Sequence, residues 1–224
     1  MLRKTKFFLQ LFIVIIFLIL NAAPSLSQAG AFDLFAVSDM AAVFEDGYDC
    51  PPPERAIDVF GIRGEYISAQ CVIKATGELQ NVTVSVSFIK NEDTGISLPD
   101  DAVSWNFVGG IFIEKNTPNL KQTDLLRPAP AWFPDYLSEE RELSIKKGNY
   151  KAVWLTIKIP RNAQAGKYSG TVSVNTGQGN ASIPLHLTIY PLTMPYERNL
   201  YVTMWYTTGK FDKYHDVKEP YSYG

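Results

Sequence analysis

Hydrophobic and polar residues alternate with a period of two along most of this chain, which is typical of β-strands that bury one face and expose the other. The clearest stretch is 79–89, where Val82, Val84, Val86 and Phe88 alternate mainly with threonine and serine. Taken together, the patterns predict strands over 56–60, 66–75, 79–89, 103–114, 150–159, 168–174 and 183–190. About eight short strands separated by turn residues predict an all-β protein, an antiparallel immunoglobulin-like β-sandwich.

Two segments depart from this alternation. Residues 116–137 are rich in proline, and we interpret them as a stiffened connection between two groups of strands. Within this connection, Trp132 and Phe133 either form an exposed platform for a sugar ring or anchor the connection against the sandwich. Residues 138–145 have weak helical character, with room for two helical turns at most.

The first 29 residues have the pattern of a secretory signal peptide. Arg3, Lys4 and Lys6 precede an apolar run of 14 residues, Phe7–Leu20, and small residues follow up to Ala29. A bilayer span needs about 20 residues, so an uncleaved membrane anchor is the less favoured alternative. We expect cleavage after position 29, delivery to the periplasm or the medium, and no stable membrane insertion afterwards.

The composition excludes some classes of binding partner and cofactor. The 224 residues carry 21 basic and 23 acidic side chains, a formal net charge of −2, so the chain lacks the basic surplus of a nucleic-acid-binding protein. Cys50 and Cys71 are its two cysteines. An oxidising compartment permits a disulfide between them, and two free thiols are the alternative. No cluster has metal-ligand spacing, so we expect neither a metal nor a cofactor.

The acids and histidines offer little catalytic signal. Neighbouring acids occur four times, at Glu45–Asp46, Glu92–Asp93, Asp100–Asp101 and Glu139–Glu140. Such neighbours point to opposite faces of a strand, and in turns they are usually solvated, so we expect no catalytic role for them. His186 is out of phase with its apolar neighbours and should lie on the solvent side of its strand.

The end of the chain has a different pattern. Residues 192–195 close the predicted sandwich, and 200–205 then form a new apolar stretch of strand type. A polar and aromatic stretch follows, without an obvious partner for this strand. The sequence therefore predicts a sandwich domain over residues 30–195 and the start of a second domain over 196–224.

Several motifs carry a family resemblance. Residues 56–75 contain Arg63-Gly64-Glu65-Tyr66 and Gln70, a tryptophan-bearing strand and a G-x-Y-x-G turn follow within 153–170, and 187–195 form a last strand. In this order the motifs resemble the N-terminal β-sandwich of glycoside hydrolase family 123 and of related uncharacterised bacterial glycosidase-like proteins.

The resemblance extends into the second domain. Residues 202–216 resemble the first strand and loop of the (β/α)₈ barrel that follows the sandwich in that family, which makes 196–224 the start of a truncated catalytic barrel. Barrel active sites form from the loops at the C-terminal ends of the strands. The resemblance therefore marks Trp205, Tyr206 and His215 as candidates for substrate contact, with barrel packing or an ordinary surface position as the alternatives.

The resemblance also implies an activity. Family members are exported β-N-acetylgalactosaminidases, which act with retention; the substrate's acetamido group is the nucleophile, and a barrel Asp-Glu pair assists it. That pair lies further along the barrel, so no catalytic residue is assigned in this chain. We predict an accessory sandwich that is not catalytic alone, in a parent hydrolase that binds an N-acetylhexosamine-containing glycan through its barrel. The alternative is a stand-alone secreted immunoglobulin-like module that binds a glycan or a protein.

Overall fold

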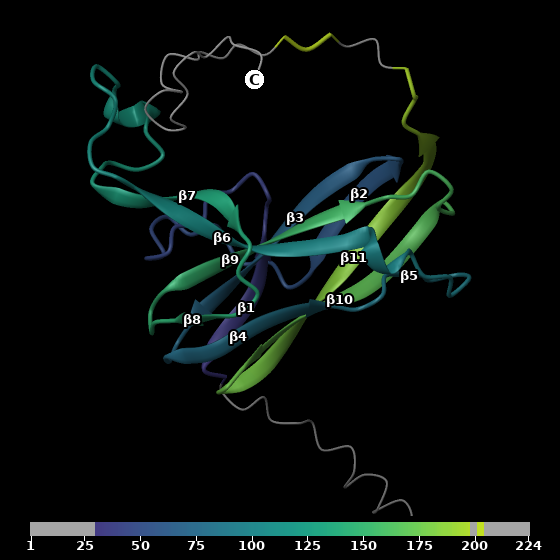
Figure 1. Ribbon diagram of the computed structural model, residues 1–224, viewed down its shortest axis with the longest axis horizontal. Coiled ribbons are helices and arrows are strands. Elements are labelled where there is room, and N and C mark those ends of the chain that lie inside the picture. The colour runs from purple at the N-terminus through teal and green to yellow at the C-terminus, as the bar shows by residue number, and fades with distance from the viewer. Residues whose placement is uncertain (1–29, 198–200, 204–224) are drawn as a thin grey trace, which may run out of the picture. The chain divides into compact units, whose positions relative to one another are not determined.

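The computed structural model describes residues 30–197 and 201–203. The strands form two sheets that pack face to face, so the β-sandwich predicted from the alternation is confirmed (Figure 1). The compact unit that contains both sheets ends at Thr193, and the chain from Met194 onward forms a separate unit. The predicted signal peptide lies outside the described residues, as does most of the predicted barrel segment.

The first sheet contains five strands in the order β1-β3-β9-β6-β7. Their bounds are β1 (Phe32–Val37), β3 (Tyr66–Ala75), β9 (Tyr150–Lys158), β6 (Val103–Ile113) and β7 (Ala131–Ser138). Every neighbouring pair in this sheet is antiparallel. The strands β6 and β7 run together toward a long connection that carries the short 3₁₀ helix η2 (Gln122–Asp124), drawn in teal in Figure 1.

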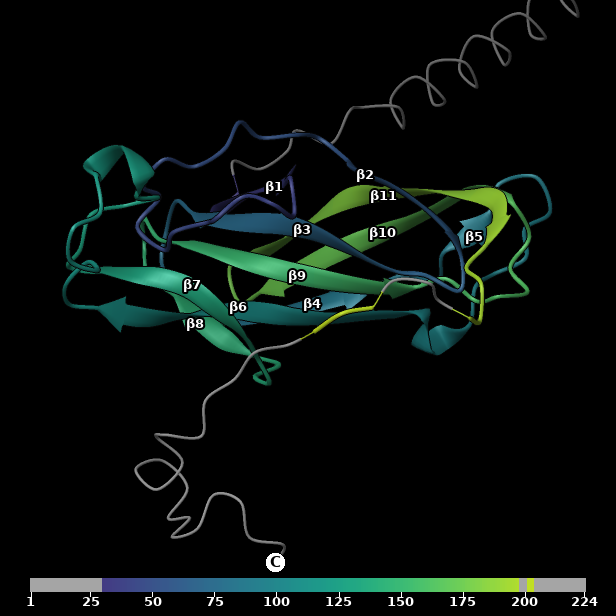
Figure 2. The same cartoon turned by 90° about the horizontal axis from the view of Figure 1, so that it is seen from above.

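The second sheet has the order β2-β11-β10-β4-β8, with β5 paired to β10. Its strands are β2 (Ile57–Arg63), β4 (Leu79–Val86), β5 (Lys90–Asn91), β8 (Leu143–Ile145), β10 (Gly166–Thr176) and β11 (Gly179–Thr193), and η1 (Asp100–Ala102) precedes β6. Figure 2 shows β10 and β11 side by side in this layer. Strands β2 and β11 are parallel, which corrects the expectation of a wholly antiparallel sandwich.

The core lies between the sheets and comes from alternate strand positions, as the period of two requires. On β9 and β11 the inward residues are each at most 2% exposed: Val153, Leu155, Ile157, Ile183, Leu185, Leu187 and Ile189. The residues between them face outward. One of these is His186, whose Nδ1 lies 2.9 Å from Oδ1 of Asp58 on the paired strand, so its predicted placement on the outer face is confirmed.

Two local predictions are wrong, and the two helical turns allowed at 138–145 do not form. Residues 131–138 form β7 rather than part of a connection, and residues 143–145 form β8 rather than the end of a helix. Strand β4 ends at Val86, so Phe88 is 57% exposed instead of continuing the buried face. Burial explains the second case, because Ile145 pairs with Leu79 and is almost completely buried, which outweighs the local helix propensity.

In the structure Cys50 and Cys71 are free thiols, which was the alternative to a disulfide between them. Cys71 is fully buried on β3 and packs in the core between the sheets. Cys50 is only partly buried, and its charge interaction is with Lys74, an even-numbered position on β3 whose side chain points to the other face.

Thiol labelling should distinguish the two cysteines. Burial raises the pKa of Cys71 to about 12, so this thiol is protonated at pH 8 as well as inaccessible. We expect the folded protein to react with one equivalent of a maleimide, at Cys50, and the unfolded protein to react with two. Intact mass after labelling gives the number of maleimides bound in each state. Two maleimides on the folded protein would contradict the burial of Cys71. No labelling of the unfolded protein without reductant would show that the two cysteines form a disulfide.

Candidate functional site

Three hollows lie along the hairpin of β6 and β7. The largest, of about 380 Å³, is lined by Gln70 and Trp154 and so opens on the outer face of the first sheet. A small central hollow of about 20 Å³ shares Glu45 and Trp132 with a third hollow of about 220 Å³, which lies on the face that carries Phe107 and Lys151. We call the central and third hollows together the hairpin groove.

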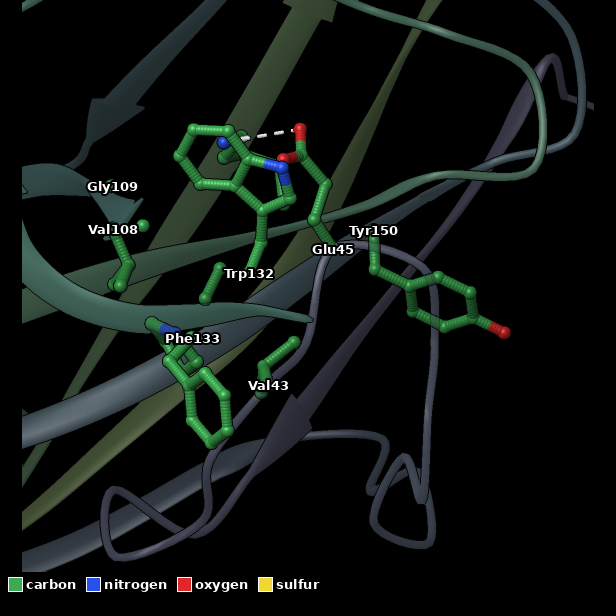
Figure 3. Close-up of a pocket in the computed structure, with 11 residues that line it drawn as sticks. Val43, Glu45, Val108, Gly109, Trp132, Phe133 and Tyr150 are labelled. Carbon is green, nitrogen blue, oxygen red and sulfur yellow. Dashed lines mark ion pairs between the residues drawn. The ribbon is translucent and has the colours of Figure 1, made fainter. Parts of the chain in front are cut away.

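Two neighbouring aromatic residues on β7, Trp132 and Phe133, point to opposite sides of the strand. Figure 3 shows the Trp132 indole on the side of the Glu45 carboxylate, whereas the ring of Phe133 points the other way. Trp132 is 56% exposed, and its ring contacts Phe112 across the hairpin at a centroid distance of 5.6 Å. Phe133 packs edge-on against Phe44 at 5.5 Å and so anchors the strand, one of the two roles considered for this pair.

The polar centre of the groove is an ion pair. Lys151 Nζ on β9 lies 3.5 Å from Glu45 Oε1, and only 16% of the lysine side chain is exposed. The backbone N–H of Tyr150 donates to the carbonyl of Glu45 at 2.8 Å, which fixes the segment at the start of β9. Gly47 follows with φ of 76°, and a side chain there would run into the Tyr150 ring.

The third hollow is built on a close approach between β6 and β7. A Cβ atom at Gly109 would lie 2.3 Å from Cζ of Tyr136, so the tyrosine ring rests directly on the glycine backbone. Only glycine permits this contact, and the pairing shifts register at the same place, between Gly109 and Gly110. Tyr136 remains 50% exposed and lines the hollow together with Trp132 and Glu140.

A buried amide shapes the large hollow on the outer face of the sheet. Gln70 on β3 is 3% exposed, and its Nε2 donates to the carbonyls of Ser38 at 2.7 Å and Ala41 at 3.0 Å. Its Oε1 accepts no hydrogen bond from any residue that the structure describes. Trp154, its cross-strand neighbour on β9, lines the large hollow beside it.

One arginine fastens the segment before the groove. Both carboxylate oxygens of Asp46 accept hydrogen bonds from Arg127, with an Nη1 to Oδ1 distance of 2.7 Å. The guanidinium carbon also lies 5.0 Å from the Phe44 ring centroid and 4.7 Å from that of Tyr48. This arrangement ties residues 44–48 to the β6–β7 connection, and the hydrogen bond from Arg127 holds the pKa of Asp46 below its usual value.

The Asp46 interaction should depend on pH. A carboxyl whose folded-state pKa is lowered stabilises the protein above its ordinary pKa of 3.8, and this contribution is lost as the pH falls through the lowered value. We expect Asp46→Asn to lower the urea midpoint at pH 7 but to match the unsubstituted protein at acid pH well below 3.8. Glu139→Gln, at an exposed acid, is the control and should show no such difference. A difference that persists in acid would contradict the assignment.

Two of the residues that the sequence singled out, Trp132 and Phe133, line the groove. Trp205, Tyr206 and His215 lie outside the described residues, so their proposed role stays a prediction. Glu45 and Asp46 are both ion-paired. Gln70, Lys151 and Tyr136 carry no sequence signal that marks a site, because their meeting depends on strand pairing. Within residues 30–197 and 201–203, no group of acids, histidines and cysteines is arranged to hold a metal, and no helix has the length and apolarity to cross a membrane.

The fold was compared with solved structures. It resembles a family 123 glycoside hydrolase from Clostridium perfringens, studied for glycolipid glycan hydrolysis, with a TM-score of 0.62 and 20% identity over 73% of this chain and 28% of that one. At this identity the likeness concerns the fold, and this chain spans little more than a quarter of that protein. A weaker match is the CooA pilin subunit of enterotoxigenic Escherichia coli, with a TM-score of 0.36 and 12% identity over 74% of this chain and 99% of that one.

The comparison of sequences gives the family. No curated protein matches the whole sequence significantly. The family described as Glycoside hydrolase 123 N-terminal domain matches residues 51–176, which is more than half of the 224 residues and includes strands of both sheets. The match covers the sandwich from β2 to β10, and the resemblance drawn from the sequence motifs is confirmed. The chain therefore belongs to the family of glycoside hydrolase 123 N-terminal domains.

Proposed function

We propose that this protein is the exported, non-catalytic N-terminal sandwich of a glycoside hydrolase. In this proposal the parent activity is that of a retaining, substrate-assisted β-N-acetylgalactosaminidase, and its catalytic residues lie in a barrel beyond the sandwich. The observation that carries the proposal is the family match over residues 51–176. The fold likeness to the Clostridium perfringens enzyme supports it, because that protein is much longer than its matched part.

The chemistry of the groove is consistent with an accessory role. Glycoside hydrolysis with two protein carboxyls needs one that can give a proton and another that can attack or activate water. Glu45 and Asp46 are instead each held by a cation, Lys151 and Arg127 respectively. Both carboxylates are already engaged by a cation, so we assign neither residue a catalytic role.

A chromogenic assay tests the absence of catalysis. The purified 224-residue protein should release no nitrophenol from p-nitrophenyl N-acetyl-β-D-galactosaminide above the rate without protein. Glu45→Gln gives a second reading, because its rate should be equally low. Turnover by the unsubstituted protein that Glu45→Gln abolishes would overturn the proposal and place the active site in the groove.

The native protein tests export and the parent activity. N-terminal sequencing of material recovered outside the cytoplasm should begin at Gly30 if the signal is removed as predicted. A native form that extends beyond residue 224 should hydrolyse the same galactosaminide with retention and be inhibited by the corresponding sugar thiazoline, which mimics the acetamido attack. Inversion, or insensitivity to the thiazoline, would contradict substrate assistance.

A further inference from the structure

Two large aromatic side chains in the hairpin groove are unusually exposed. Trp132 is more than half exposed and Tyr136 is half exposed, although both are large side chains that proteins normally bury in part. Contacts hold both rings in position, because Trp132 packs against Phe112 and Tyr136 packs on Gly109. Two rings held in place beside a hollow of about 220 Å³ offer flat apolar surface without an entropy cost for ordering them.

Polar groups line the same depression. Figure 3 shows the Glu45 carboxylate beside Trp132, and Lys151, whose Nζ lies 3.5 Å from Glu45 Oε1, also lines the central hollow. Ser138 and Glu140 line the third hollow. A ligand for this surface must therefore combine apolar faces with many hydroxyl or amide groups. Sugar rings have this character, since their C–H faces stack on aromatic rings while their hydroxyls bond to carboxylates, ammonium groups and amides.

The size of the groove sets the size of the ligand. Its main hollow measures about 220 Å³, and two aromatic rings, Trp132 and Tyr136, line it. A hollow of this size fits about one sugar unit of a glycan rather than an extended chain.

The charge of the groove narrows the class further. Its lining includes the acids Glu45 and Glu140 and one cation, Lys151, which is already paired with Glu45. This surplus of negative charge disfavours sialylated or sulfated glycans and the phosphates of nucleic acids. We propose that the hairpin groove binds a sugar unit of a neutral oligosaccharide, with Trp132 as its stacking platform, independently of any hydrolysis in the parent protein.

A glycan array and two matched variants test this proposal. Labelled protein is applied to an array of neutral, sialylated and sulfated oligosaccharides, and the strongest neutral ligand is then titrated by calorimetry. Trp132→Ala removes the platform, and we expect it to weaken binding about tenfold or more. Phe60→Ala is the control, because Phe60 is 69% exposed on the other sheet and also contacts one aromatic partner, Tyr190.

The outcomes separate the possibilities. Retention of neutral glycans by the unsubstituted protein and by Phe60→Ala, but not by Trp132→Ala, supports the hairpin groove as the binding site. Equal thermal midpoints for the two variants, with recovery of binding in Trp132→Phe, exclude a folding defect. Three results overturn the proposal: no neutral glycan retained at millimolar concentration, a preference for sialylated or sulfated glycans, or equal affinities for the two variants. Any of these leaves the accessory role in a hydrolase standing.

Discussion

Replacing Leu155 by alanine is expected to lower the free energy of unfolding by about 3–4 kcal/mol. Leu155 is completely buried at the middle of β9, the central strand of the first sheet, and pairs with Ala69 on one side and Trp105 on the other. The variant loses the transfer free energy of the leucine side chain and leaves a cavity, which two hydrogen-bonded sheets cannot readily collapse to fill. Urea unfolding followed by tryptophan fluorescence measures the change.

Two further variants show whether burial is the cause. Leu155→Met keeps most of the volume, so its loss should stay below about 1.5 kcal/mol. Thr156→Ala changes the next residue, which is on the opposite face and pairs with Ser68 and Ser104, so its effect should be below about 1 kcal/mol. Similar losses for Leu155→Ala and Thr156→Ala would mean that the alternation of faces on β9 is wrong.

The strands with strict alternation could be predicted from the sequence, because each one buries a single face. Strand β9 is the best example: Val153, Leu155, Ile157 and the following Ile159 were assigned to one face and are all buried. Strand β7 was missed because Pro134 and the prolines just before the strand favoured a connection. It lies at the edge of the sheet, where proline and strand are compatible.

Pairing across the chain could not be predicted in the same way. The parallel alignment of β2 with β11 joins Ile57 to Leu185 and so depends on contacts between strands far apart in sequence. The hairpin groove has the same origin, because it joins residues from β6, β7, β9 and the segment around Glu45. The sequence marked Trp132 as a possible sugar platform, since an exposed aromatic residue can be suspected from its neighbours. It could not place Glu45 or Lys151 beside it.

Replacing Gln70 by methionine is expected to lower the free energy of unfolding by about 2–3 kcal/mol, although methionine has nearly the same shape. The buried amide of Gln70 donates to two backbone carbonyls, at Ser38 and Ala41. In the variant the Ser38 carbonyl still accepts a hydrogen bond from the N–H of Ala41. The loss of stability therefore comes mainly from the Ala41 carbonyl, which is partly buried and would lose the hydrogen bond from Gln70. Denaturant unfolding gives the size of the loss.

The comparison with Gln70→Glu assigns this loss to the donors rather than to packing. Glutamate has the size of glutamine but offers only acceptors when ionised, so its carboxylate would face two carbonyl oxygens. We expect Gln70→Glu to be less stable than Gln70→Met at pH 7 and to recover in acid, because the protonated carboxyl regains one donor. A Gln70→Met variant as stable as the original protein would show that the turn at 38–41 is held by other contacts. The wall of the large hollow, which contains Ala41, would then not depend on this amide.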